Sequence, residues 1–120
     1  MRYVLALIVL AAVGLPSDRS YARAFLDRAV PAAGGAVDTV PKEIRLIFSE
    51  AIEPMFSGAS LTTASGKVVA TENAAADPQD SKQLVLPLPS LPPGRYRVRW
   101  HVVSANADRS EGSFEFEIQP

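Results

Sequence analysis

The chain has few side chains that could do chemistry. His101 is its single histidine, Met55 is its single methionine beyond the first residue, and there is no cysteine. An imidazole could act as a base or as a metal ligand, and a thioether could bind a soft metal ion. His101 falls on the polar side of an alternating segment, so we interpret it as a surface residue near Glu115. Met55 stands beside Phe56, and we interpret it as filling the core.

Catalysis finds no support in the residue pattern. A Ser-His-Asp triad would have to use His101, and no nucleophile motif accompanies it. There is no glycine-rich phosphate loop and no zinc-type spacing. Carboxylates such as Glu50 and Asp108 could meet in space, but paired acids alone are a weak signal. We therefore expect that the protein is not an enzyme.

One stretch near the C-terminus alternates strictly between apolar and polar side chains. The apolar set is Tyr96, Val98, Trp100 and Val102, and the polar set is Arg95, Arg97, Arg99 and His101. A period of two is typical of a strand with one buried and one solvated face. The polar set could face an anionic partner or belong to a salt-bridged sheet face, and the second reading is favoured.

The last predicted strand, 113–118, alternates in the same way. Its aromatic side chains and Ile118 should face the core, and its two acids should face outward. If the two strands pair in antiparallel fashion, the acids come opposite the basic row. We expect Glu115 and Glu117 within salt-bridge reach of at least one of Arg97, Arg99 and His101.

Seven short extended segments are predicted in all, separated by turn-forming residues. They are Phe25–Ala29, Ile44–Phe48, Ala59–Thr62, Lys67–Ala70, Gln83–Leu88, Arg95–Ser104 and Ser113–Ile118. Ser65-Gly66 suggests a hairpin, 50–56 a turn of helix, 73–81 a mobile loop, and 104–112 a polar loop. This pattern predicts an all-β fold, an immunoglobulin-like Greek-key antiparallel β-sandwich of about seven strands.

The N-terminus reads as an export signal. A basic start, an apolar run over 4–15 and small residues at Ser20 and Ala22 are typical of a cleaved signal peptide. We expect a signal peptide over residues 1–22, cleavage after Ala22, and one domain over residues 23–120 with no transmembrane segment. The formal net charge of −1 gives no basic footprint for nucleic acid.

Several short motifs, taken in order, resemble the CopC family of periplasmic copper-binding proteins. They are Arg23-Ala-Phe-Leu-Asp, Pro31-Ala-Ala-Gly, Pro41, Phe48-Ser-Glu, Glu53-Pro-Met-Phe-Ser, Gly94-x-Tyr-x-Val-x-Trp and Gly112-x-Phe-x-Phe. The resemblance covers nearly all of the chain after the leader. It implies the sandwich fold, a periplasmic location, a role in copper homeostasis and resistance, and a partner of the CopD type, a copper-transporting inner-membrane protein.

The resemblance also implies a Cu(II) site, and here this sequence departs from the family. In the family, the mature amino terminus with its first-residue histidine, a loop aspartate, a loop histidine and a nearby carboxylate surround the metal. The matching positions are Arg23, Asn106, Asp108 and Glu50. Only the backbone amine of Arg23 can ligate, because a guanidinium stays protonated. One nitrogen with hard oxygen donors suits Cu(II) less well than imidazole does.

Two functions therefore stay open. The first is a CopC-like copper-binding protein with weakened or altered metal binding. The second is a non-metal periplasmic binding module that keeps the fold and contacts a protein partner. We further hypothesise that an ion pair between Arg23 and Asp108 closes the gap that copper bridges in the family.

Overall fold

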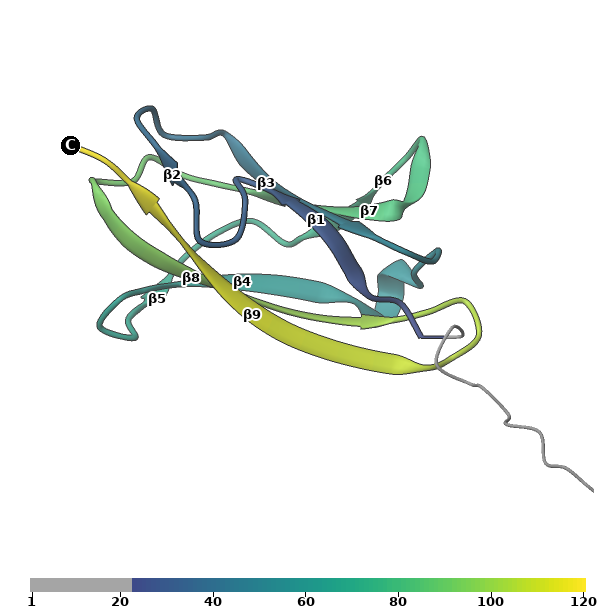
Figure 1. Ribbon diagram of the computed structural model, residues 1–120. Coiled ribbons are helices and arrows are strands. Elements are labelled where there is room, and N and C mark those ends of the chain that lie inside the picture. Colours follow the sequence, from purple (N-terminus) through teal and green to yellow (C-terminus); the bar gives the residue numbers. More distant parts are fainter. Residues whose placement is uncertain (1–22) are drawn as a thin grey trace, which may run out of the picture.

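Alternating burial builds two β-sheets that pack face to face (Figure 1). The computed structural model describes residues 23–120; the expected leader and its cleavage point after Ala22 lie outside this range. The first sheet has the order β1-β3-β7-β6, from Leu26–Val30, Glu43–Phe48, Asp80–Pro87 and Ala75–Asp77. The second has the order β2-β9-β8-β4-β5, from Ala36–Val37, Arg109–Ile118, Gly94–Val103, Gly58–Thr63 and Val68–Val69. The expected all-β sandwich is confirmed.

The core lies between the two sheets. On β3, every second side chain is buried, and the same holds over much of β7, β8 and β9. Its largest fully buried side chains include Phe48, Phe116, Ile44, Leu46, Leu61, Leu84, Leu86 and Ile118. The Tyr96 hydroxyl donates a hydrogen bond of 2.6 Å to the Pro92 carbonyl oxygen, a corner contact familiar from immunoglobulin-like sandwiches. Among residues 23–120, no helix is long and apolar enough to span a membrane.

The antiparallel pairing of β8 with β9 confirms the predicted hairpin. Arg97 lies opposite Glu115, and its Nη2 is 2.8 Å from Glu115 Oε2. Arg95 reaches the same carboxylate at 3.6 Å and lies opposite Glu117 in the ladder. The expectation holds for Glu115; for Glu117, no ion pair is formed within residues 23–120.

Three local predictions are corrected. Residues 73–81 are not a mobile loop, because they supply β6 and the start of β7. The polar loop after Ser104 is shorter than predicted, because strand pairing resumes at Arg109. Met55 is not core filling: it lies on the 3₁₀ turn η2 (Pro54–Phe56) with 89% of its surface exposed.

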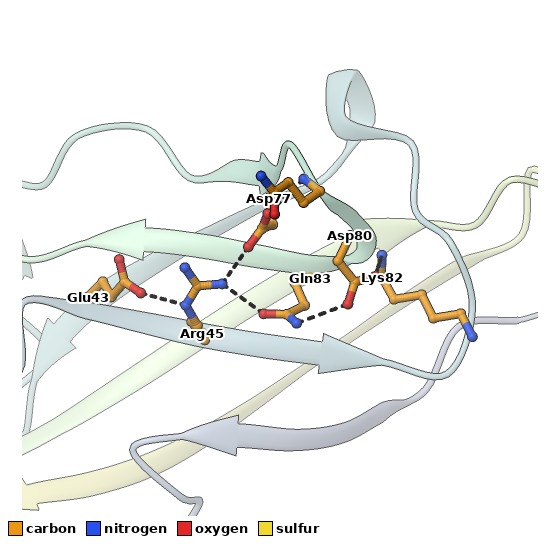
Figure 2. A network of polar contacts seen from close by, with 7 residues as sticks. Glu43, Arg45, Asp77, Asp80, Lys82 and Gln83 are labelled. Atoms are coloured by element: carbon orange, nitrogen blue, oxygen red, sulfur yellow. Dashed lines mark hydrogen bonds and ion pairs between the residues drawn. The ribbon is translucent and has the colours of Figure 1, made fainter.

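A polar network on the outer face of the first sheet explains why β6 and β7 form a hairpin where a mobile loop was predicted (Figure 2). Arg45 on β3 donates to Glu43 at 2.6 Å, to Asp77 at 2.7 Å and to Gln83 at 2.8 Å. The hydrogen bond from Arg45 lowers the pKa of Asp77, and the backbone N–H of residue 82 lowers the pKa of Asp80. One guanidinium thus ties β3, β6 and β7 together, and its partner Asp77 belongs to the segment that was predicted to be a loop.

Candidate functional site

The start of the chain, the segment after β3 and the β8–β9 turn meet at one end of the sandwich (Figure 1). Phe25 donates its backbone N–H to Ser49 Oγ at 2.9 Å, and Ser49 N–H donates back to the Phe25 carbonyl at 2.8 Å. The Ser110 hydroxyl donates to the Ala24 carbonyl at 2.6 Å. These bonds hold the first described residues between β3 and β9.

The turn at this end is organised by Ser104, which is fully buried. Its Oγ accepts hydrogen bonds from the backbone N–H groups of Asn106 and Asp108, both at 3.3 Å. Ala107 takes a left-handed conformation with φ 70°, which L-residues adopt mainly in tight turns. The Ala105 N–H donates to the Ala51 carbonyl at 3.0 Å, so the turn lies against the residue that follows Glu50.

The backbone therefore brings the segments of all four predicted ligand positions to one end, but the side chains do not form a metal centre. Arg23 and Asn106 are exposed, and Glu50 and Asp108 are half-buried. Within residues 23–120, no group of three or more histidine, cysteine, aspartate or glutamate side chains is placed to hold a metal ion. This donor set, which has no imidazole, fits Cu(II) poorly.

The hypothesised ion pair between Arg23 and Asp108 is also absent from the described part of the chain. Arg23 instead lines an open hollow of about 1090 Å³. The turn contributes Ala107 to this hollow, and Asp108 is not among the lining residues. The two charges thus occupy different surroundings at the same end of the sandwich.

This hollow has both apolar and polar lining residues. Phe25, Phe56 and Trp100 are among the apolar ones, and Arg23, His101, Arg109 and Glu111 are among the polar ones. Phe25 is 49% exposed and Phe56 is 63% exposed. The arrangement could hold a ligand that offers both apolar surface and polar groups.

Two glycines on the neighbouring strands leave space for the rings of Trp100 and His101 on β8. A Cβ on Gly112 of β9 would lie 2.6 Å from Trp100 Cζ2, so the indole covers that glycine on the inner side of the sheet. A Cβ on Gly58 of β4 would lie 2.9 Å from His101 Cε1 and 3.3 Å from Nε2. Sequence reasoning missed both contacts. A glycine inside a strand often marks the close approach of another group, but the strands predicted from sequence began at Ala59 and Ser113, so neither glycine lay inside one.

His101 is a surface residue, as predicted, but its neighbour is different. In the register of the sheet it lies opposite Gly58 on β4 and Glu111 on β9. Glu115, the neighbour expected from sequence, lies opposite Arg97. The only imidazole of the chain therefore borders the hollow together with Glu111 and Arg23.

Comparison with protein families decides the relationship. A model of the CopC domain matches residues 26–119. The chain belongs to the CopC family. This result confirms the resemblance that the short motifs indicated.

Relatives within the CopC family include proteins of known name. Protein YobA of Escherichia coli K12 is 40% identical over 99% of this chain and 94% of its own length. Copper resistance protein C of Escherichia coli is 35% identical over 78% of this chain and 79% of its own length.

Solved structures of CopC proteins share the fold. CopC from Methylosinus trichosporium OB3b superposes with a TM-score of 0.76 at 34% identity, covering 81% of this chain and 94% of that one. PcoC from Escherichia coli, described as a methionine-rich copper resistance protein, gives a TM-score of 0.74 at 36% identity, covering 82% of this chain and 100% of that one. The present chain has only Met55 beyond its first residue, so it is not methionine-rich.

Proposed function

We propose that this chain is an exported, non-enzymatic CopC-type protein of copper homeostasis that binds Cu(II) weakly. Family membership supports the copper role. The single observation that argues for weak binding is the absence of imidazole from the ligand positions of the family, where Arg23 and Asp108 stand instead. The hydrogen-bonded frame around those positions is nevertheless formed.

The chemistry of the donors explains the expected weakness. Cu(II) binds nitrogen donors in preference to hard oxygen donors, and neutral imidazole is its commonest nitrogen ligand in proteins. The family positions here offer the α-amino group of a processed chain, two carboxylates and one amide oxygen. The two guanidinium groups of Arg23 and Arg109 line the adjacent hollow and repel a dication. Both factors lower the affinity.

A weak binder suits delivery or buffering in the periplasm rather than long-term storage. We place the processed protein in the periplasm, with a copper-transporting inner-membrane protein of the CopD type as its partner. Fractionation of cells that express the chain, followed by mass measurement of the exported form, tests both the location and cleavage after Ala22.

A second candidate function is a non-metal binding module that contacts a protein partner. It is favoured by exposed apolar side chains at the site end of the sandwich. Met55 and Phe56 project from η2, which hydrogen bonds hold to the end of β8: Glu53 N–H donates to the Val103 carbonyl at 2.8 Å. Such side chains mark protein contacts more often than an isolated surface leucine does.

The decisive experiment is competition for Cu(II) between chelators of graded affinity and the processed protein that starts at Arg23. We expect a weak chelator to remove the metal from the wild type. A matched variant, Arg23→His with Asp108→His, restores imidazole at both positions. Its affinity should rise by at least about tenfold, since even the hydrogen-bond partners of metal ligands are worth that much.

Two results would contradict the proposal. Tight binding by the wild type would show that the replaced positions do not control affinity. No Cu(II) binding by the wild type, together with an intact fold in circular dichroism, would remove the copper role and leave the binding module as the better account.

A further inference from the structure

The hollow at the site end of the sandwich has a lining of the kind found in protein interfaces. Phe25, Phe56 and Trp100 contribute aromatic rings, and Arg23 and Arg109 contribute guanidinium groups. Aromatic residues and arginine are enriched in interfaces, and tryptophan and arginine are frequent among the residues that contribute most to binding. Sites for small molecules usually enclose most of the ligand. This hollow of about 1090 Å³ is open, so a segment of a protein chain fits it better.

Exposed apolar side chains gather around this hollow. Phe25, Met55 and Phe56 are three of the six large apolar side chains that are exposed among residues 23–120. Phe25 and Phe56 line the hollow, and Met55 precedes Phe56 on the turn η2. Apolar groups that cluster at one place on a surface mark interaction sites, whereas scattered ones do not. The hollow and η2 therefore form one candidate contact surface.

Hydrogen bonds hold this surface in place before any partner binds. The backbone of Phe25 exchanges two hydrogen bonds with Ser49. The Ser57 hydroxyl donates to the Glu53 carbonyl at 2.7 Å and accepts from the Val103 N–H at 3.2 Å, so η2 is tied to β8. A preformed surface loses less conformational freedom on binding, which favours affinity.

The charge of the lining is positive, although the chain as a whole has a formal net charge of −1. Among the described residues, the lining holds the guanidinium groups of Arg23 and Arg109 and one carboxylate, that of Glu111. None of these three groups forms an ion pair within residues 23–120, so both cations are available to a partner. Removal of the expected leader would add the α-amino group of Arg23. The other acids at this end do not line the hollow; they are Glu50, Glu53 and Asp108.

We propose that the hollow binds a segment of a partner protein that carries carboxylates among large apolar side chains. The apolar side chains pack on Phe25, Phe56 and Trp100, and the carboxylates pair with Arg23 and Arg109. A guanidinium holds a carboxylate through two parallel hydrogen bonds, which gives the contact a direction as well as a charge. The inference goes beyond the copper role, and it gives the second candidate function a surface and a kind of partner.

A protein segment explains the lining better than an anionic membrane does. Recognition of anionic lipid generally uses a cluster of about four or more basic side chains. The hollow offers two, and the carboxylate of Glu111 lies among them. Paired contacts with individual carboxylates suit this mixed lining, whereas a broad negative surface would also meet Glu111.

Fluorescence anisotropy with the processed protein and a labelled peptide of alternating glutamate and phenylalanine tests the proposal. We expect saturable binding that weakens as the salt concentration rises, because exposed ion pairs are screened. A peptide with glutamine in place of each glutamate should bind at least about fivefold more weakly, since a contact that matters at an interface is worth that factor or more. The same loss is expected when serine replaces each phenylalanine.

Matched variants locate the contact on the protein. Arg109→Gln and Phe56→Ser should each lower the affinity for the acidic peptide at least about fivefold. Arg99→Gln and Val68→Ser are the controls, because they remove an exposed cation and an exposed apolar side chain that do not line the hollow. Both controls should leave the affinity unchanged. All four positions are exposed, so circular dichroism should show an intact fold in each variant.

Three results would overturn the inference. The first is no binding of the acidic peptide even at millimolar concentration. The second is an equal loss of affinity in Arg99→Gln and Arg109→Gln, which would show a general attraction between charges. The third is binding to phosphatidylglycerol vesicles without binding to the peptide, which would assign the surface to a membrane. None of them would touch the copper role, which the competition for Cu(II) measures separately.

Discussion

Replacing Gly112 by alanine tests the packing of the single tryptophan. The added Cβ would lie 2.6 Å from Cζ2, 3.0 Å from Cε2 and 3.3 Å from Nε1 of Trp100. Carbon atoms in favourable contact are about 3.5–4.0 Å apart. The indole must therefore move by roughly 1 Å, away from the position in which its ring meets Phe48 edge-on with centroids 5.2 Å apart.

The expected change in the free energy of unfolding combines two losses and one gain. Overpacking of a core costs about 1–3 kcal/mol, and a disturbed aromatic pair loses part of the roughly 0.5–1.5 kcal/mol that such pairs contribute. Alanine in place of glycine inside a strand gains about 0.5–1 kcal/mol by reducing the freedom of the unfolded chain. We expect Gly112→Ala to lower the free energy of unfolding by about 1–2 kcal/mol.

Urea unfolding followed by tryptophan fluorescence measures this change, because Trp100 is the only reporter. The emission maximum of the folded variant should shift as the ring moves. Ser113→Ala, at the exposed neighbouring position, is the control and should stay within about 0.5 kcal/mol of the wild type. A variant as stable as the wild type would refute the reasoning. So would an equal loss in a Trp100→Leu background, where the collision is removed and circular dichroism replaces fluorescence.

Three further predictions concern the frame and the surface. The pKa values of Asp77 and Asp80 are lowered in the folded state, so their contribution to stability is present at neutral pH and is lost as the pH falls below about 4. In Arg45→Met this acid-induced loss of stability should be smaller, which urea unfolding midpoints at several pH values would show. Ser104→Ala removes the buried acceptor of two backbone N–H groups and should cost about 1–2 kcal/mol, with faster hydrogen exchange in the turn; unchanged exchange would argue against this role. Met55 is 89% exposed, so Met55→Ser should change stability by no more than about 0.5 kcal/mol in thermal unfolding, whereas a buried methionine would lose several times that.

The periodic part of the fold could be predicted from sequence, and the register of β8 with β9 shows why. A strict period of two in both segments fixes which face is buried, and opposite charges in the outer rows favour the pairing of Arg97 with Glu115 that the structure contains. The β6–β7 hairpin could not be predicted in this way. The hairpin is held by Arg45, which lies some thirty residues earlier in the chain and meets Asp77 only in the folded sheet.

The candidate site shows the same division. The ligand positions of the family could be assigned from motif spacing, and their backbone frame is formed. The prediction that Met55 fills the core was wrong. It relied on the apolar character of the side chain and gave too little weight to Pro54, which begins the exposed turn η2. The contact of His101 with Gly58 was invisible in sequence, because it depends on a register between strands that are more than forty residues apart.

The hydrogen bond between Ser110 and Ala24 links residues that are 86 positions apart in the chain. Closing so long a loop early in folding is entropically unfavourable, so contacts of this kind form late in sandwiches of high contact order. The end of the sandwich is therefore complete only once β9, the last strand of the chain, has joined the sheet. Any ligand that binds there stabilises the finished fold alone, by an amount that grows with its free concentration. Occupancy of the hollow would thus distinguish the fully folded protein from chains in which β9 has not yet joined the sheet.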